Sequence, residues 1–561
     1  MSVSRLERDG RAETRSFRSF LEYGFPIEEM VSWTTKLVEG TGSGHLIKMR
    51  LKELNSEIPY QEGLFLSNIF REGIERSKAL AEELLKGKRF EWWDLEEYRK
   101  RMSGIFNNTS PGQFVNVLGR YALNRVGGSG PLMFVNYTDL FSENNDGVFL
   151  DALTNASVTN FGQGYPLHLI AANTLNRLTG GAQCPPYHPG PLMEEAALAL
   201  LSVMPIETKE AKVAWFNSGG DAVSVAIAAA EKYTQKTHGE NVHRRKAVFF
   251  KEAYHGNIEG RAGKVTSGIN QSFHAKDRNS IELEYPNKEK EIDPVLNVIK
   301  RLINNDEISC VVFEATQGDG GGVSMQPDFF IELVKLSLDK QIPLIADEVQ
   351  SGFGRSGKVF DVEYLLDHWR NSSYVVNEHY PEKPPMIIAV AKSMTNGVAP
   401  GSAVIFPKEY AVLERAEGLN TYSAHPTTLA ATIATVSLMG SETLEMVNHK
   451  RKIFEQTIAP YIGENELIKG IRGHGLHLFL ELPSGINQVL QIELLGGSRI
   501  ITGTVSRDAL RVHAPLNAHD TVWEALAKVI GETANQIKNE GASEQTLRIL
   551  NYGGPSGLAI R

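Results

Sequence analysis

Between about residues 195 and 410, short apolar runs alternate with longer stretches in which apolar residues recur at helical spacing. The apolar runs are AKVAWFNS, RKAVFF, ISCVVFEA, IPLIADEV, MIIAVAK and GSAVIF. Such short runs, rich in β-branched and aromatic residues, predict buried strands, and their alternation with helices predicts a mostly parallel sheet with flanking helices. Ligands of open sheets of this kind bind beyond the carboxyl ends of the strands. Functional residues are therefore expected where these runs end.

The pattern changes on both sides of this region. Residues 26–105 are rich in charges and helix formers, as in EGIERSKALAEELLKGKRFEWWDLEEYRKRM, and predict a helical extension. Turn residues cluster at 107–131 and indicate a boundary. After about residue 440, the runs GLHLFLELP and ALRVHAP and the amphipathic VWEALAKVIGETANQI predict a smaller α+β domain. The expected division is a helical N-terminal extension, an N-terminal segment of the core, a large domain and a small C-terminal domain, over residues 1–125, 126–195, 196–435 and 436–561.

Composition and charge narrow the choice of partner. The 561 residues are 42% hydrophobic, enough for a large core and more than one packed region. The net charge of -9 argues against nucleic acid or an anionic membrane surface, so a small-molecule partner is expected. Cys184 and Cys310 are far apart, which argues against a disulfide framework or a structural zinc site. The charged N-terminus and the absence of an apolar run of about 18 residues predict a cytoplasmic protein without a membrane span.

A turn of small residues, Ser218-Gly219-Gly220, follows the first apolar run and opens an alanine-rich helix. Backbone amides at a helix N-terminus, next to residues that let a ligand approach, form an anion site, and phosphate is the usual anion. A glycine-rich turn also serves simply to change the direction of the chain. Taken alone, this turn leaves both interpretations open.

Two further strand ends carry polar or aromatic residues. Tyr254 and His255 follow FFKEA, where an aromatic ring could stack on a planar ligand or could simply be buried. Glu314, Gln317 and Asp319 follow VVF in a glycine-rich loop, which suits close approach to a ligand or to another backbone, or a plain surface turn. No second histidine stands at metal-ligand spacing from His255, so no metal site is expected there.

Asp347 and Lys392 end two apolar runs, IPLIAD and MIIAVAK. A buried ammonium is costly, so a lysine at such a place forms an ion pair or has a depressed pKa, and in the second case it can attack a carbonyl. Each charge alone could belong to a structural salt bridge. Together with the glycine turn and Tyr254 they match pyridoxal 5′-phosphate (PLP), which needs an amine for its aldehyde and a carboxylate for its ring nitrogen. Glu348 points to the other side of the strand and is expected to make structural hydrogen bonds.

The ordered motifs NSGGDAV, AYHG, EATQGDGGG, LIADEVQSGFGRSGKVF, AVAKSMTNG, NTYSAHPTTLAATIATVSLM and LRVHAPL resemble the class III, fold-type I PLP-dependent aminotransferases. The resemblance covers about residues 130–535. It implies the α/β fold-type I PLP-transferase fold, in which residues 196–435 form the PLP-binding domain. It also implies a homodimer that moves an amino group from an amino acid or amine to an oxo acid, ketone or aldehyde.

The same resemblance implies roles for the residues near the cofactor ring. Lys392 would form the internal aldimine and then carry a proton between the substrate Cα and the cofactor. Asp347 would pair with the pyridinium nitrogen. Val349 and Tyr254 would lie on opposite faces of the ring, and Gln350 would contact the ring hydroxyl.

Other roles concern the phosphate and the substrate. Gly219 and Gly220 would offer backbone amides to the phosphate, and Thr421 would reach the phosphate of the neighbouring subunit. Arg511 would take a substrate carboxylate. Asp319 stands where relatives that use an ω-amine carry a glutamate that masks this arginine, and it is one methylene shorter. The cofactor-binding set implied by the resemblance also includes Ser218, His255 and Glu314.

Alternatives remain at the level of sequence. The same lysine, aspartate and phosphate site serves racemases, decarboxylases and aminomutases, and a binding protein that keeps the fold without turnover is a third hypothesis. The chain also departs from the family. It has Ser-Gly-Gly-Asp at 218–221 where Ser-Gly-Thr-Glu is common, an insertion near 361–385, and the extension 1–125, which either wraps the dimer and active site or recognises a partner.

Overall fold

The computed structural model describes most of the chain with nine continuous stretches. These are residues 57–87, 121–139, 147–179, 190–239, 246–256, 260–267, 280–414, 417–418 and 420–551. Among them, no helix is long and apolar enough to cross a membrane.

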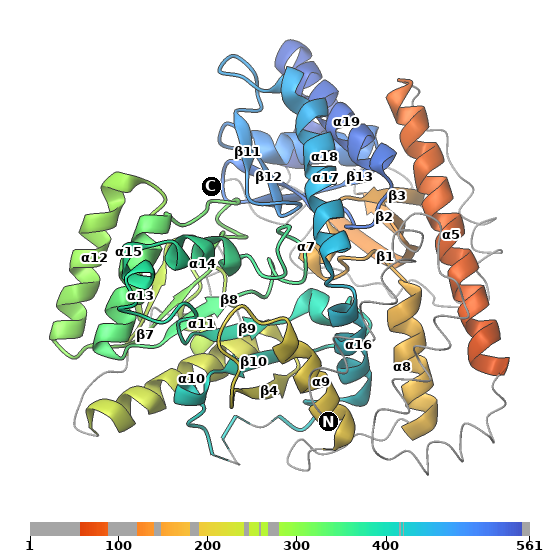
Figure 1. Ribbon diagram of the computed structural model, residues 1–561. Coiled ribbons are helices and arrows are strands. Elements are labelled where there is room, and N and C mark those ends of the chain that lie inside the picture. Colours follow the sequence, from red (N-terminus) through yellow and green to blue (C-terminus); the bar gives the residue numbers. More distant parts are fainter. Residues whose placement is uncertain are drawn as a thin grey trace.

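A seven-stranded sheet forms the centre of the large domain, in the order β4-β10-β9-β8-β7-β5-β6 (Figure 1). The strands are β4 (Lys212–Phe216), β5 (Lys246–Phe250), β6 (Ser280–Leu283), β7 (Ile308–Phe313), β8 (Leu344–Asp347), β9 (Ile387–Val390) and β10 (Ser402–Phe406). Strand β10 runs antiparallel to β4 and β9, and all other neighbours are parallel. The predicted mostly parallel sheet is confirmed, and all six apolar runs listed above form strands in it.

Alternate residues of each strand pack into different cores on the two faces of the sheet. On β7, Cys310 and Val312 join the core that α10 (Gly219–His238) covers, whereas Val311 and Phe313 join the core beneath α12 (Glu289–Asn304) and α13 (Pro327–Lys340). Successive side chains of a strand point to opposite faces, so a strand buried on both sides must be apolar throughout. This explains the unbroken apolar runs of the sequence.

The N-terminal segment contributes a second sheet. Its strands are β1 (Tyr121–Ser129), β2 (Leu132–Asp139) and β3 (Gly147–Asp151), all antiparallel, with the short β13 (Ile500–Ile501) parallel to β3. The glycine-rich end of the expected boundary 107–131 forms β1 and the turn into β2. The register shifts between Arg125 and Gly127, and a glycine suits such a bulge.

The small C-terminal domain is built on a third, antiparallel sheet, in the order β11-β12-β15-β14. Its strands are β11 (Gly470–Arg472), β12 (Leu478–Glu481), β14 (Gly503–Val505) and β15 (Ala509–Val512), and its helices are α17 (Ser441–Ile458), α18 (Ile486–Gly497), α19 (Asp520–Glu540) and α20 (Glu544–Asn551). This domain lies above the large sheet in Figure 1. The α+β unit expected after residue 440 is thus present.

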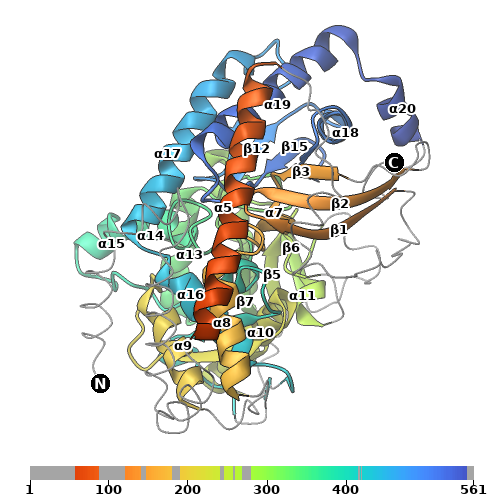
Figure 2. The same cartoon turned by 90° about the vertical axis from the view of Figure 1, so that its right-hand side faces the viewer.

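Of the helical extension expected over residues 1–125, the described part is mainly α5 (Glu57–Leu85). It packs along α8 (Pro166–Thr179) and α19, and Lys528 Nζ of α19 donates a hydrogen bond to the carbonyl of Leu85. Figure 2 shows α5 running along the molecule from the small domain to α8. The rest of the extension lies outside the described residues.

The remaining helices connect these sheets. They are α7 (Thr154–Ser157), α9 (Pro191–Ser202), α11 (Arg261–Lys264), α14 (Val362–Arg370), α15 (Ser373–Val376) and α16 (Pro426–Ser437). The insertion near 361–385 contains α14 and α15, and its Leu366 and Trp369 are fully buried beside α13. It is therefore an integral part of the large domain.

Candidate active site

The carboxyl ends of four neighbouring parallel strands bring the predicted site residues to one edge of the sheet. Strands β5, β7, β8 and β9 are parallel neighbours in the central sheet. Tyr254, Glu314, Asp347 and Lys392 stand at or just beyond their ends. Gly322, in the loop that follows β7, lies so close to Phe479 of β12 that a side chain on it would overlap the phenylalanine ring. This edge of the sheet therefore faces the small domain.

Asp347 is buried and held on both of its oxygens. Its Oδ2 lies 2.7 Å from Nδ1 of His255, and its Oδ1 accepts a hydrogen bond from the backbone N–H of Val349 at 3.0 Å. Burial opposes a charge on His255, but the hydrogen bond and the proximity to Asp347 outweigh burial and raise the pKa of His255. The protein therefore holds the carboxyl group at the end of β8 in a fixed orientation.

Glu314, at the end of β7, accepts hydrogen bonds from the segment that follows β5 and from the loop that follows β7. Its Oε2 accepts from the backbone N–H of Tyr254 at 3.3 Å, and its Oε1 accepts from that of Gly318 at 3.1 Å. Burial, with a contribution from Asp347, raises the pKa of Glu314 to about 7, although His255 opposes this. Near neutral pH this carboxyl group can therefore be protonated or ionised.

Lys392 begins the short 3₁₀ helix Lys392–Thr395 with a backbone φ of 48°, in the left-handed region. Non-glycine residues in this region cost free energy and often mark functional sites. Burial and the nearby Arg511 cation lower the pKa of Lys392 to about 8, against the effect of Asp319, Asp347 and Glu314. A lysine with this pKa has a substantial uncharged fraction near neutral pH, as a nucleophilic amine requires.

The small-residue turn begins α10 as expected. Ser218 caps the helix: its Oγ accepts from the Asp221 N–H at 3.2 Å, and its own N–H donates to Asp221 Oδ2 at 3.1 Å. The shorter carboxylate of Asp221 therefore closes the capping box. The departure from Ser-Gly-Thr-Glu leaves the helix N-terminus intact.

Gly219 of this turn and Gly256 beside it leave no room for side chains, whereas a Cβ on Gly220 would meet nothing closer than 3.8 Å. A Cβ on Gly219 would lie 2.8 Å from Val349 Cγ1, and a Cβ on Gly256, whose φ is 123°, would lie 3.0 Å from the Cα of Gly220. Backbone amides at the start of α10 are thereby exposed to a close ligand, as a phosphate would require. Gly219, Gly220 and Gly256 together form a cradle at the start of α10, and Val349 lies directly against it.

Gln350 and Tyr254 occupy the space beside it. A Cβ on Gly318 would overlap the amide of Gln350, so this glycine makes the space for the glutamine side chain. The amide Oε1 of Gln350 lies 3.4 Å from His477 Nε2 of the small domain. Tyr254 is half-buried, and burial together with Asp319 raises the pKa of its hydroxyl.

Arg511 and Asp319 meet at the other side of the site. Arg511 Nη1 of β15 lies 3.6 Å from Asp319 Oδ1, an ion-pair distance that is too long for a hydrogen bond. Arg511 is only 8% exposed, and within the described part of the chain its Nε and Nη1 have no hydrogen-bond partner. Its guanidinium can therefore still bind a carboxylate. Asp319 reaches Arg511 despite its shorter side chain.

The glycines after Asp319 serve a different purpose from ligand contact. A Cβ on Gly321 would lie 2.8 Å from that of Ala509, and one on Gly322 would overlap Phe479. Both glycines have positive φ angles. They let the loop pack closely against side chains of the small domain.

Glu348 faces away from Asp347, as expected from strand alternation. Its Oε1 accepts from the N–H of Val362 at 2.6 Å, and its Oε2 accepts from the N–H of Asp361 at 3.0 Å and from Ser351 Oγ at 2.7 Å. Burial and the neighbouring Asp361 raise the pKa of Glu348 to about 8. This carboxyl group binds the start of α14.

A left-handed turn next to Arg511 was not predicted from the sequence. Residues 154–157 all have φ between 48° and 67°. Asp151 Oδ1 accepts from the N–H groups of Leu153 and Thr154, and Ser157 Oγ lies 3.0 Å from Nδ1 of His513. A Cβ on Gly503 would lie 2.7 Å from Leu153 and 3.3 Å from Arg511 Nε, so the turn and the arginine are close.

Arg355 was also missed, although it lies within the quoted GFGRSG. It is fully buried and donates to Asn160 Oδ1 at 2.8 Å and to the carbonyl of Ala514 at 2.7 Å. Burial lowers its pKa to about 9. The arginine joins the N-terminal segment, the large domain and the small domain behind the site.

Thr421 is exposed and lies apart from the residues just described, in the loop before α16. Its neighbour Asn420 accepts a hydrogen bond from Asn217, the residue before the phosphate-type turn, at 2.8 Å. Within the described ranges, no group of three or more His, Cys, Asp or Glu side chains could hold a metal ion.

Comparison with known proteins agrees with this geometry. The family model "Aminotransferase class-III" matches residues 137–533. The acetylornithine aminotransferase of Lactococcus lactis is 23% identical over 376 residues, which cover 66% of this chain and 87% of the relative. The alanine/serine racemase of Pyrococcus horikoshii is 28% identical over 374 residues, which cover 61% of this chain and 71% of the relative. Among solved structures, the Toxoplasma gondii ornithine aminotransferase has a TM-score of 0.61 at 18% identity, with 80% of this chain and 100% of that chain covered.

A transaminase from a marine Virgibacillus has a TM-score of 0.62 at 20% identity, with 80% of this chain and 99% of that chain covered. These two likenesses show the fold. The match of the family model over more than half of the sequence confirms the resemblance and the predicted class of enzyme. The chain belongs to the class-III aminotransferases, a family of PLP-dependent enzymes.

Proposed function

We propose that this chain binds PLP at the edge formed by β5, β7, β8 and β9, with Lys392 as its covalent anchor and Asp347 opposite its ring nitrogen. One observation carries the proposal: these two residues stand at the carboxyl ends of adjacent parallel strands, with Asp347 paired to Ala389 of β9. When bound, PLP supplies an aldehyde and an electron-withdrawing ring that stabilises negative charge on the substrate Cα.

The residues around this pair fit each part of the cofactor. Close packing at Gly219 and Gly256 excludes side chains from the start of α10, which suits a phosphate there. Val349 lies against Gly219, which supports its predicted place on one ring face, and half-buried Tyr254 is proposed for the other. The contact with His255 holds the Asp347 carboxyl group in place, opposite the position proposed for the ring nitrogen.

Each charged residue then has a defined task in amino-group transfer. Lys392 Nζ, uncharged above a pH of about 8, can take the proton from the substrate Cα and return it. Arg511 binds the substrate carboxylate with the donors that the protein leaves unpaired in the described residues. Asp319 pairs with Arg511 when no carboxylate is present there, which suits a substrate that presents an ω-amine.

The substrate class follows from this arrangement and from the relatives. We infer an amino acid donor whose carboxylate reaches Arg511, and a partner substrate in the range that acetylornithine and ornithine aminotransferases handle. Racemisation is the second candidate, because a relative of 28% identity is named an alanine/serine racemase. Thr421, exposed on the single chain, is the proposed contact to the cofactor phosphate of a second copy.

Borohydride treatment followed by peptide mass spectrometry tests the anchor. Holoprotein is expected to carry reduced PLP on Lys392, Lys392→Ala is expected to carry none, and Lys408→Ala, which removes an exposed lysine paired with Glu210, is expected to match the wild type. Label at another lysine would overturn the assignment. A panel of amino donors then separates the two candidate reactions: transamination yields an oxo acid, whereas racemisation inverts the donor and yields none.

Mixing two variants tests the proposed dimer. Thr421→Ala and Lys392→Ala should each lose cofactor affinity or activity. A hybrid of the two contains one site with Lys392 from one copy and Thr421 from the other, so it should recover activity in that site. A light-scattering mass of a single chain, or no recovery on mixing, would contradict the shared site.

A further inference from the structure

A loop of the small domain places two histidines against the active-site side of the large domain. The loop, residues 472–478, connects β11 to β12 and carries His474 and His477, whose N–H donates to the carbonyl of His474 at 2.9 Å. The two side chains reach different parts of the large domain. The loop therefore joins the two domains at two neighbouring points.

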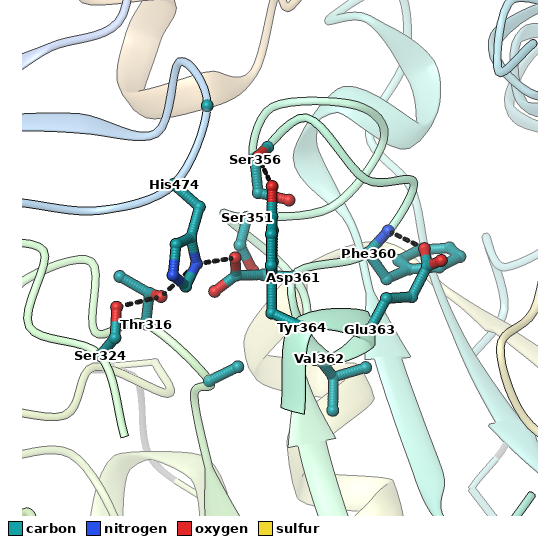
Figure 3. A network of polar contacts seen from close by, with 12 residues as sticks. Thr316, Ser324, Ser351, Ser356, Phe360, Asp361, Val362, Glu363, Tyr364 and His474 are labelled. Atoms are coloured by element: carbon teal, nitrogen blue, oxygen red, sulfur yellow. Dashed lines mark hydrogen bonds and ion pairs between the residues drawn. The ribbon is translucent and has the colours of Figure 1, made fainter. Parts of the chain in front are cut away.

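His474 anchors the loop (Figure 3). Its Nδ1 lies 2.9 Å from Asp361 Oδ1 and 3.3 Å from Thr316 Oγ1, and Thr316 in turn bonds Ser324 Oγ at 2.9 Å. The imidazole also stacks on Tyr364 with ring centres 4.1 Å apart. Because Thr316 follows β7 and Asp361 precedes α14, the anchor spans two separate segments of the large domain.

His477 is fully buried and lies next to Gln350. Its Nε2 is 3.4 Å from Gln350 Oε1, while its ring packs against Phe479 and His513 at centroid distances of 4.8 Å and 5.0 Å. On the other side, Gly318 leaves room for the glutamine, because any side chain there would overlap the amide. Gln350 is thus held between a glycine and a histidine.

The protonation state of His477 determines whether it can bind the oxygen or the NH₂ group of the Gln350 side-chain amide. Burial, opposed by Asp361 and reinforced by Arg355, Arg511 and His474, lowers the pKa of His477 to about 3, so the ring is neutral. A neutral imidazole has one N–H and one bare nitrogen. Since the amide oxygen only accepts, the hydrogen belongs on Nε2. The bare Nδ1 is then the atom without a partner among the described residues.

We propose that His477 is a positioning residue for the cofactor site. Its Nε2–H binds Gln350 Oε1 and thereby turns the NH₂ group of the same amide away from the histidine, where this group can donate a hydrogen bond. This inference rests on the proposed function, in which Gln350 contacts the ring oxygen of PLP. An oxygen that carries negative charge needs a donor, and an amide rotated by half a turn would present its own oxygen instead. The rotated state is unfavourable because its NH₂ group would face the Nε2–H, and a shift of that hydrogen to Nδ1 would leave a buried donor without a partner among the described residues.

The spectrum of the holoenzyme provides the test, because the ring oxygen that Gln350 contacts is part of the chromophore. His477→Phe keeps an aromatic ring in the same packing and removes the donor. We expect it to shift the pH midpoint of the visible absorption and to weaken PLP retention several-fold, up to about tenfold, as for the loss of one hydrogen bond. An unchanged midpoint and unchanged retention would overturn the proposal.

A double-variant comparison shows whether the effect passes through Gln350. In a Gln350→Ala background, His477→Phe should cause no further change in midpoint or retention. An equal change in both backgrounds would show that His477 acts in another way and would contradict the proposal. Phe479→Leu loosens the packing beside His477 but retains its N–H, so its midpoint is expected to equal that of the wild type.

Two further variants cover folding and donor chemistry. His477→Gln supplies an amide N–H in the same place and should lie between the wild type and His477→Phe, and equality with His477→Phe would contradict a role for the donor. If His477→Phe does not fold, His477→Met provides the apolar replacement. Failure of the proposed function is distinguishable, because the wild type itself would then show no visible absorption with PLP.

Discussion

Asp347 Oδ2 lies 2.7 Å from His255 Nδ1, with both side chains buried beneath the end of the central sheet. The contact joins an acid and a base from parallel strands β8 and β5, which are separated by β7 in the sheet. It fixes the one carboxylate that a pyridinium would need. It also makes each partner dependent on the other, because a buried charge without its partner is costly.

Removal of one partner should therefore destabilise the protein more than removal of both. Asp347→Ala removes the carboxylate that raises the pKa of buried His255 and leaves its Nδ1 without this partner, and we expect a loss of roughly 3 kcal/mol in the free energy of unfolding of the apoprotein. The double variant with His255→Phe should lose less than the sum of the single variants. Urea unfolding of the four proteins measures this, and strict additivity would mean that the two groups are not coupled.

The lowered pKa of Lys392 predicts how cofactor uptake depends on pH. Only the uncharged amine attacks an aldehyde, and a lysine with a lowered pKa loses its proton at lower pH than a free one. The rate of covalent PLP attachment to apoprotein should therefore rise with pH and reach half of its maximum near pH 8, as absorbance can follow. Arg511→Leu removes a neighbouring cation and should move this midpoint upward. A midpoint near that of free lysine, about 10.4, would contradict the influence of the site.

The proposed contact between Arg511 and the substrate carboxylate predicts that affinity for the substrate falls when the guanidinium group is removed. Arg511→Lys keeps the charge but cannot bind a carboxylate with two parallel hydrogen bonds, so KM for an active amino acid donor should rise about tenfold or more. Arg472→Lys is the matched control, since Arg472 lies in the same small domain and pairs with Glu481 and Asp508 instead. A KM that rises equally in both variants would indicate a general effect of the domain.

The close packing of Gly219 predicts a compensating pair of substitutions. Gly219→Ala places a Cβ 2.8 Å from Val349 Cγ1 and should displace the cradle, with a clear loss of PLP retention during dialysis. Val349→Ala in the same chain removes the colliding methyl groups and should restore part of the retention. Absence of any rescue would mean that the alanine acts through the backbone of the turn and not through Val349.

The strands of the large sheet were readable from the sequence because both of their faces are buried. Strand β6 escaped notice for the opposite reason: SIEL lies at the edge of the sheet, its residues are only half-buried, and its pattern is short and mixed. The glycines within residues 126–130 belong to a bulged hairpin, and a bulged hairpin and a linker share the same composition. Local pattern cannot separate these cases.

Within the site, residues at strand ends were predictable, whereas contacts between domains were not. Asp347 and Lys392 stood out as charges at the end of apolar runs. His477 and Gln350 are 127 positions apart, and nothing in the local sequence of either connects them. The left-handed turn at 154–157 was equally hidden, since a conformation that tertiary hydrogen bonds impose leaves no periodic signal.

The two adjacent acids at the end of β8, Asp347 and Glu348, also help to set the register of this strand. Asp347 is held by His255 on one side of the strand, and Glu348 accepts three hydrogen bonds from Ser351, Asp361 and Val362 on the other. A slip of β8 by one residue would turn each acid to the opposite face of the strand, away from its hydrogen-bond partners. Because these partners lie on opposite faces, the dipeptide Asp347-Glu348 favours the observed pairing of β8 with its neighbours.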